Sequence, residues 1–355
     1  MCTQVPILWG RLMTRFKLDT CVWELTRRCN FNCAYCGTRA GKKGEGELTF
    51  EESAGVAQQL IDMKCRRVVI IGGEAFLYSG WDKICKMLTS AGVDTSIITN
   101  GALVDEGIVR DLKNAGIKHV SVSIDGAQEV HDKYRTQGSF DKAVAAIKLL
   151  KSNGIVTSVI STLNAESAKT LQELADVLLP LGIEAWQMQA CSPFGNAADR
   201  RSLIMSKDDM AAVCDFVYAN KPRSKTILLV ADNIGYHTEK EQGIRLKTGG
   251  CFGGCSAGIT VVGIDSLGNV RGCESLYADE FIEGNLKTQT LYEIWNSPDS
   301  FAYNRKFTRD MLTGRCADCE MWYRCAGGCR SFNYFNTGKM YESAVCLRAA
   351  LAPDA

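Results

Sequence analysis

The sequence predicts an α/β protein in which a partial (β/α)6 barrel of the TIM type precedes a small cysteine-rich domain that carries a β-hairpin. Two observations predict this fold. From residue 21 to about 235, short runs rich in Val, Ile and Thr alternate with amphipathic segments, and six such units in a row imply a parallel sheet that closes into part of a barrel. Eight of the 17 cysteines then lie at or beyond Cys251.

The predicted strands are short and end in polar or glycine residues. They are Cys21–Thr26, Arg67–Ile71, Thr95–Thr99, His119–Ile124, Thr157–Leu163 and Glu184–Gln189. The predicted helices between them include Thr49–Lys64, Asp105–Ala115, Phe140–Asn153, Ser167–Leu181 and Lys207–Asn220. Thr49 and Glu52 have the spacing of a capping box, which places the start of the first helix.

We expect four parts: an N-terminal extension (1–20), the barrel (21–235), a linker (236–250) and the C-terminal domain (251–355). The last apolar run before the linker is Thr226–Ala231. Within the C-terminal domain, Ile259–Ile264 and Val270–Gly272 flank a turn of about five residues, which predicts a β-hairpin. Leu291–Asn296 predicts a short helix. Such a small, cysteine-dense domain is better stabilised by metal than by its own core.

Composition excludes several classes of protein. The net charge of +1 gives no basic footprint for nucleic acid or for an anionic membrane. The apolar run Val5–Trp9 is interrupted by Arg11, Arg15 and Lys17, so it is too short for a signal peptide or a membrane span. We therefore expect a cytoplasmic protein, where thiols stay reduced and clustered cysteines are metal ligands.

Cys29, Cys33 and Cys36 form C-x3-C-x2-C directly after the first predicted strand. Three thiolates can hold three irons of a [4Fe–4S] cluster and leave the fourth iron open for a ligand. In a parallel barrel this loop lies at the mouth, where active sites are found. A zinc knuckle is the alternative, but zinc takes four ligands, and all three histidines lie far along the chain (His119, His131, His237).

With this motif the chain resembles the radical S-adenosylmethionine (radical SAM) superfamily, in which an aromatic residue, here Tyr35, precedes the last cysteine. Other landmarks follow at successive strand ends: Gly72-Gly-Glu74, Thr99-Asn-Gly101, Ser123-Ile-Asp125 and His131-Asp-Lys-Tyr-Arg135. Ala75 stands where relatives often have proline. Alone, each landmark would be a plain βα turn. The resemblance implies that SAM is bound through Tyr35, Gly72, Gly73, Glu74, Asn100, Ser123 and Asp125.

The resemblance also implies the chemistry. SAM binds the open iron, one electron from the cluster breaks its S–C5′ bond, and the 5′-deoxyadenosyl radical abstracts hydrogen from a substrate C–H bond. The electron would come from a donor such as flavodoxin or ferredoxin. A different functional class, a non-catalytic iron–sulfur electron carrier, is the alternative, but an electron carrier has no use for an iron with an open coordination site.

The C-terminal cysteines have the spacing C-x12-G-x4-C, then C-x2-C-x5-C-x3-C and a last cysteine, which resembles the SPASM domain of peptide-modifying radical enzymes. The resemblance implies two auxiliary [4Fe–4S] clusters, and so three in all. The implied ligand sets are Cys251, Cys255, Cys273 and Cys329 for one, and Cys316, Cys319, Cys325 and Cys346 for the other. The alternative is a zinc ribbon that leaves Cys255, Cys273 and Cys346 without partners (Cys316, Cys319, Cys325, Cys329).

Five further side chains are candidates for a catalytic or binding role. Glu274 follows a cluster ligand, and in sulfatase-maturating relatives an acidic residue at the matching position is the base; a solvated carboxylate is the alternative. Of Gln187 and Gln189, we expect one, Gln187, to face the barrel mouth and the other the helices. Asn164 is a similar cofactor-binding candidate. Cys191 is either a hydrogen-atom donor or, as we prefer, a buried small side chain.

We expect a peptide substrate. Modification of ribosomally made peptides is the commonest work of the family, and two auxiliary clusters offer an exit for electrons, which favours an oxidative crosslink. The alternative is dehydrogenation or epimerisation of a small molecule such as a sugar or tetrapyrrole. Only about twenty residues precede the first predicted strand, so we expect that a separate leader-binding protein presents the peptide, or that the substrate is short or not a peptide.

Overall fold

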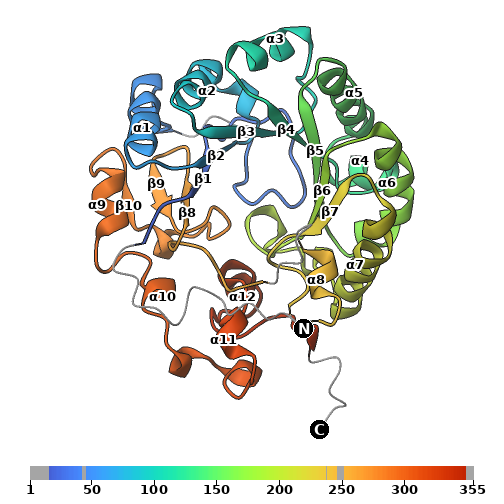
Figure 1. Cartoon of the computed structure of the whole chain (residues 1–355), viewed down its shortest axis with the longest axis vertical. Coiled ribbons are helices and arrows are strands. Elements are labelled where there is room, and N and C mark those ends of the chain that lie inside the picture. Colours follow the sequence, from blue (N-terminus) through green and yellow to red (C-terminus); the bar gives the residue numbers. More distant parts are fainter. Residues whose placement is uncertain (1–15, 42–44, 237, 246–251, 349–355) are drawn as a thin grey trace.

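The computed structural model describes residues 16–41, 45–236, 238–245 and 252–348. In these ranges one sheet contains ten strands in the order β10-β9-β8-β1-β2-β3-β4-β5-β6-β7. Figure 1 shows the sheet curving into an open barrel with helices around its outside. The strands are β1 Thr20–Glu24, β2 Arg67–Ile71, β3 Asp94–Thr99, β4 His119–Ser123, β5 Val156–Leu163, β6 Ala185–Ala190, β7 Ile227–Val230, β8 Val261–Ile264, β9 Asn269–Arg271 and β10 Gly284–Asn285.

Helices follow the barrel strands and cover their outer face, as βα units require. The helix α1 begins with the expected capping box between Thr49 and Glu52. The α-helices are α1 Phe50–Asp62, α2 Trp81–Ser90, α3 Glu106–Asn114, α4 Gln128–Tyr134, α5 Ser139–Ser152, α6 Leu171–Leu178, α7 Lys207–Asn220, α8 Glu241–Ile244, α9 Leu291–Asn296, α10 Ala302–Arg305, α11 Trp322–Cys325 and α12 Arg330–Thr337.

Alternation along the strands separates the core from the barrel interior. In β2, Val68 and Ile70 are fully buried against the helices, whereas Val69 and Ile71 line the interior. Side chains of a strand alternate between the two faces, so the inward row is i, i+2, i+4. The hydrophobic core therefore lies between sheet and helices, and the inside of the barrel stays hollow.

The C-terminal residues join the same sheet. β8 pairs in parallel with β1, with Thr20 opposite Val261, and β9 returns antiparallel to β8. This is the expected hairpin, and α9 coincides with the expected short helix. Figure 1 shows α9 beside β9 and β10, and α10, α11 and α12 below the open side of the barrel.

The predicted partial barrel is confirmed, with two differences in detail. The apolar run before the linker forms β7, a seventh parallel strand beside β6. The predicted helix Ser167–Leu181 is divided into a 3-10 turn, α6 and a second 3-10 turn that contains Pro180, because proline at this point cannot donate to a continuing helix. None of the helices in the described residues is long and apolar enough to cross a bilayer. The proposed domain boundaries stay predictions.

Candidate active site

A cavity of about 700 Å³ occupies the inside of the barrel. Its lining includes Cys29, Cys33 and Cys36 from the loop after β1, at the mouth. The same cavity reaches Arg67 and His119, the first residues of β2 and β4, at the opposite end of the strands. One space thus connects the predicted cluster loop with the floor of the barrel.

The three motif cysteines converge on this cavity, in a loop that donates hydrogen bonds to their sulfurs. The Phe31 N–H lies 3.3 Å from Cys29 Sγ, and the Ala40 N–H lies 3.2 Å from Cys36 Sγ. Burial raises the pKa of Cys33 to about 11. Three thiols around one cavity, with N–H donors to sulfur, fit a [4Fe–4S] cluster with three protein ligands. In the described part of the chain, no three His, Cys, Asp or Glu side chains could hold a single metal ion.

Tyr35 fixes the cluster loop to the end of β4. Its hydroxyl donates to Asp125, which also forms an ion pair with Arg135 and accepts the Thr162 N–H at 2.7 Å. Burial alone would raise the pKa of Asp125, but Arg135 outweighs it and the pKa is lowered. Asp125 is therefore ionised and engaged by three donors, whereas Ser123 of the same landmark lines the cavity.

Gly72 and Gly73 follow β2 and press against the backbone that enters the cluster loop. A Cβ atom on Gly73 would lie 2.3 Å from the Arg28 carbonyl oxygen, and one on Gly72 would lie 2.9 Å from the Thr26 carbonyl oxygen. The Gly73 N–H donates to Thr26 O at 2.6 Å. Only glycine permits this approach, so the turn and the cluster loop are held in one arrangement.

Glu74 and Asn100 lie behind this turn. The buried Glu74 carboxylate accepts the Thr99 hydroxyl and the Asn100 N–H, both at 2.8 Å. Burial raises the pKa of Glu74 to about 7. The Asn100 amide donates to Asn30 Oδ1 in the cluster loop at 2.8 Å. The predicted residues from β2 and β3 are therefore brought together at the loop.

Glu274 lines the same cavity, directly after Cys273. Its side chain is buried, yet neither carboxyl oxygen has a hydrogen-bond partner among the described residues. Burial, then the negative charges of Glu24 and Asp265, raise its pKa well above the usual range. Arg271 opposes this shift but is paired with Asp265 at 2.7 Å. A solvated surface carboxylate, the alternative from sequence, is excluded by this burial.

The expectation for Gln187 and Gln189 was wrong in one respect. Both side chains line the cavity, and the residues on either side, Trp186 and Met188, are buried against the helices. Residues two apart on a strand share a face. Asn164 is buried and caps the following turn, because its Oδ1 accepts the N–H groups of Glu166 and Ser167 at 2.9 Å. Its Nδ2 has no hydrogen-bond partner in the part of the chain that the structure describes.

Cys191 packs into a small apolar cluster with Tyr35, Ala197 and Leu203. It is 1% exposed, and burial raises its pKa to about 12. This environment favours the preferred interpretation, a buried small side chain.

Two C-terminal cysteines, Cys255 and Cys329, lie near Cys273, the residue before Glu274. Burial raises the pKa of Cys273 to about 12, and the neighbouring Cys255 and Cys329 thiols add to the shift. These three belong to the first implied ligand set. Its fourth member, Cys251, lies outside the described residues.

The second implied set forms a separate group. Burial raises the pKa of Cys325 to about 12, and Cys316, Cys346 and Cys319 add to it. The Ser343 N–H donates to Cys316 Sγ at 3.3 Å. Because Cys329 lies with Cys255 rather than with this group, the grouping favours two cluster sites over a zinc ribbon.

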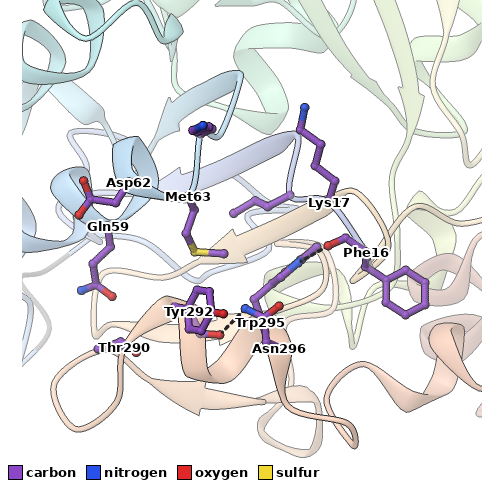
Figure 2. Close-up of a pocket in the computed structure, with 11 residues that line it drawn as sticks. Phe16, Lys17, Gln59, Asp62, Met63, Thr290, Tyr292, Trp295 and Asn296 are labelled. Atoms are coloured by element: carbon purple, nitrogen blue, oxygen red, sulfur yellow. Dashed lines mark hydrogen bonds between the residues drawn. The ribbon is translucent and has the colours of Figure 1, made fainter. Parts of the chain in front are cut away.

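A second cavity of about 670 Å³ lies between α1 and α9, at the start of β1. Figure 2 shows Met63, Tyr292 and Trp295 around it, with the Trp295 indole N–H donating to Phe16 O. It contains none of the predicted site residues, so we assign it no part in the chemistry.

Comparison with known families decides the identity of this arrangement. Residues 23–178 match the model of the radical SAM superfamily, and residues 255–320 match that of the SPASM iron–sulfur cluster-binding domain. The chain therefore contains a radical SAM segment followed by a SPASM segment. It is a radical SAM enzyme with a SPASM region, and the resemblance stated from the motifs is confirmed.

Two radical SAM relatives align over most of the chain. The AdoMet-dependent heme synthase of Methanosarcina barkeri is 29% identical over 92% of this chain and 95% of that protein. The mycofactocin maturase MftC of Mycolicibacterium smegmatis is 28% identical over 92% of this chain and 82% of that protein. These lengths show that the similarity includes both the barrel and the SPASM region.

Solved structures confirm the fold. Streptococcus suis SuiB bound to S-adenosylmethionine superposes with a TM-score of 0.72 at 16% identity, over 92% of this chain and 76% of that chain. The structure of anSMEcpe with bound AdoMet superposes with a TM-score of 0.72 at 19% identity, over 92% of this chain and 93% of that chain.

The sequence motifs missed one contact to the cluster loop. Asn196, after β6, donates from its side chain to Cys33 O at 2.9 Å. These residues are 163 positions apart, and a lone Asn in a loop gives no signal that would have identified it.

Proposed function

We propose that this radical SAM enzyme oxidises a ribosomally made peptide and forms a crosslink in it. One observation carries the proposal. The unpaired, buried carboxyl of Glu274 lies beside Cys273 in the cavity that the motif cysteines also line. Oxidation of a carbon radical requires a group that accepts a proton and a centre that accepts an electron. Glu274 and the auxiliary cluster that Cys273 would ligate could supply both at one place.

The binding roles follow the geometry. Cys29, Cys33 and Cys36 would hold the SAM cluster, and the two C-terminal cysteine groups would hold two auxiliary clusters. When bound, these groups would supply the electron that splits SAM and would take up the electron that the substrate loses. The turn at Gly72 and Gly73 lines the cavity together with Asn100, Ser123 and Gln187, and we propose that SAM binds among these residues.

The proposed oxidation removes two hydrogens from the peptide. The substrate C–H bond gives its hydrogen atom to the 5′-deoxyadenosyl radical, which becomes 5′-deoxyadenosine. Closing the crosslink removes one further electron, which an auxiliary cluster would take up, and one proton. The ionised form of Glu274 would accept this proton, and the raised pKa of that carboxyl makes its ionised form a stronger base. The cavity inside the barrel would keep water and other hydrogen donors from the radical.

A peptide is supported by the relative named a mycofactocin maturase, which aligns over 92% of this chain. We propose that a separate protein presents the peptide and that flavodoxin or ferredoxin supplies electrons.

The first test is iron content and 5′-deoxyadenosine formation in protein reconstituted without oxygen. We expect about twelve irons per chain, and about eight with loss of 5′-deoxyadenosine when Cys29, Cys33 and Cys36 are all replaced by alanine. About four irons with one zinc would contradict two auxiliary clusters. Intact iron without 5′-deoxyadenosine under strong reductant would contradict the whole proposal.

A tetrapyrrole is the second candidate substrate, because the relative from Methanosarcina barkeri named a heme synthase aligns over 92% of this chain. Parallel incubations with an iron tetrapyrrole and with peptides encoded near the gene would separate the two. Substrate-dependent loss of two hydrogens from a peptide supports the first candidate, and a mass change in the tetrapyrrole alone overturns it.

A further inference from the structure

The loop after β6 makes close contact with the cluster loop. The Asn196 side chain donates to Cys33 O, and its backbone N–H donates to Cys36 O, each at 2.9 Å. From the other side, Arg39 Nη2 donates to Gly195 O at 3.0 Å. Two of the three motif cysteines are therefore held by one short segment that is remote in sequence.

Two glycines make this contact possible. Gly195 has φ +58, and a Cβ atom on it would lie 2.2 Å from Cys36 O. A Cβ atom on Gly37, next to Cys36, would lie 2.5 Å from a ring carbon of Phe194. The contact is backbone to backbone at Gly195 and ring to backbone at Gly37. Because the two loops are packed so closely, a shift of Phe194 or Gly195 displaces the cluster loop.

The same segment contacts the SPASM region, by which we mean the proposed C-terminal domain 251–355 that includes the matched residues 255–320. The rings of Phe194 and Phe335 stack with centroids 4.8 Å apart and planes 25° apart. Arg201 Nη2 also donates to Phe335 O at 3.5 Å. Phe335 belongs to α12, which begins directly after Cys329, an implied ligand of the first auxiliary set.

The helix α12 is a rigid support for Phe335. Arg330, in its first turn, is fully buried and donates to Asn304 Oδ1 at 3.0 Å and to Ala326 O at 2.6 Å. Phe332 and Asn333 are buried as well, and the Asn333 amide donates to Gly327 O at 2.6 Å. A helix fixed in this way holds Phe335 in one place.

We propose that Phe194, Asn196 and Phe335 are positioning residues that set the cluster loop from the SPASM region. Phe335 fixes the Phe194 ring, and the segment that follows fixes Cys33 and Cys36 relative to the turn at Gly73. The SPASM region thereby contributes to SAM binding without touching SAM. This proposal rests on ligation of the SAM cluster by the three motif cysteines.

The decisive variant is Phe335→Ala, because it lies outside the cluster loop. We expect the KM for SAM in substrate-free 5′-deoxyadenosine formation to rise roughly tenfold, with a smaller change in kcat, since a displaced loop misplaces the iron that SAM binds. The EPR g values of the reduced, SAM-bound cluster should shift, and amide exchange at 33–37 should accelerate. Phe335→Tyr keeps the stacking and should restore all three measurements.

Tyr323→Ala is the matched control, because Tyr323 is also a partly exposed aromatic residue of the C-terminal domain and its ring contacts Trp322 and Arg324 instead of α12. It should leave the KM, the g values and the exchange at 33–37 unchanged. Equal effects of both alanine variants would mean general loosening and would overturn the proposal, as would an unchanged KM in Phe335→Ala at full iron content. Low iron in every variant and in the parent would instead contradict the cluster ligation itself.

Discussion

Glu74 and Glu274 are both buried carboxyl groups near the mouth of the barrel, but their surroundings differ. Glu74 accepts two hydrogen bonds from the end of β3, and its pKa is raised to about 7 by burial. Glu274 accepts none. A buried carboxyl without partners is costly for the fold, so the fold retains at Glu274 a group that is free to react.

Replacing Glu274 with glutamine should separate two steps. SAM cleavage to 5′-deoxyadenosine should continue, because Glu274 takes no part in it, while product formation should fall at least about a hundredfold, since the proton acceptor is gone. Mass spectrometry of substrate and 5′-deoxyadenosine measures both. Glu280→Gln, at an exposed carboxyl bonded to Tyr334, is the control, and a fully active Glu274→Gln would remove the base from the mechanism.

Asp125→Asn should destabilise the protein by about 3–5 kcal/mol, because it leaves the buried Arg135 guanidinium without its counter-charge. Anaerobic denaturant unfolding measures the loss. Asp299→Asn, which breaks an exposed ion pair with Lys306, should change nothing measurable. A small effect at Asp125 would mean that Arg135 finds another partner.

His131 should give the stability a specific pH dependence. Burial lowers its pKa from 6.5 to about 4. Between these two pH values, His131 is therefore protonated in the unfolded chain but neutral in the folded protein. The stability that the neutral His131 contributes is therefore fully present above pH 6.5 and is lost as the pH falls toward 4. At pH 5.5 the free energy of unfolding is lower by about 1.4 kcal/mol. The melting temperature should drop about 2–4 °C more between pH 7.5 and 5.5 than in His131→Gln. Equal drops would contradict the assignment.

At the scale of elements, α1 offers a test of local capping. Thr49 accepts the Glu52 N–H, and the Glu52 carboxylate accepts the Thr49 N–H at 2.8 Å. Thr49→Ala should cost about 1 kcal/mol in the free energy of unfolding. Thr308 precedes a 3-10 turn without making a cap bond, so Thr308→Ala should have no such effect.

At this scale, elements were predicted from the sequence when their signal lay in neighbouring residues, and contacts between residues far apart in the sequence were not. The capping box, the hairpin and the strands β1 to β6 are local patterns, and they were predicted. The broken helix at Pro180 was missed although its cause is local. The contact of Asn196 with Cys33 was beyond reach, because nothing in the spacing says that the loop after β6 folds back on the loop after β1.

At the scale of the molecule, the barrel and the SPASM region differ in what stabilises them. Most of the continuous hydrophobic core lies between the sheet and its helices, whereas residues 301–348 contain five of the cysteines. Removing iron with a chelator should therefore expose residues 301–348 to protease first, with the barrel remaining as a protected fragment. Mass spectrometry of the fragments, beside the iron-loaded protein, measures this. First cleavage inside the barrel would contradict it.

The pairing of β1 with β8 also has a consequence during synthesis. Thr20 meets Val261 across the sheet, so one edge of β1 stays open while about 240 residues are translated, for roughly 12 to 50 s at ordinary elongation rates. An open strand edge invites pairing with other nascent chains. Slower translation should therefore lower the yield of folded protein, and chaperones that shield strand edges should restore it.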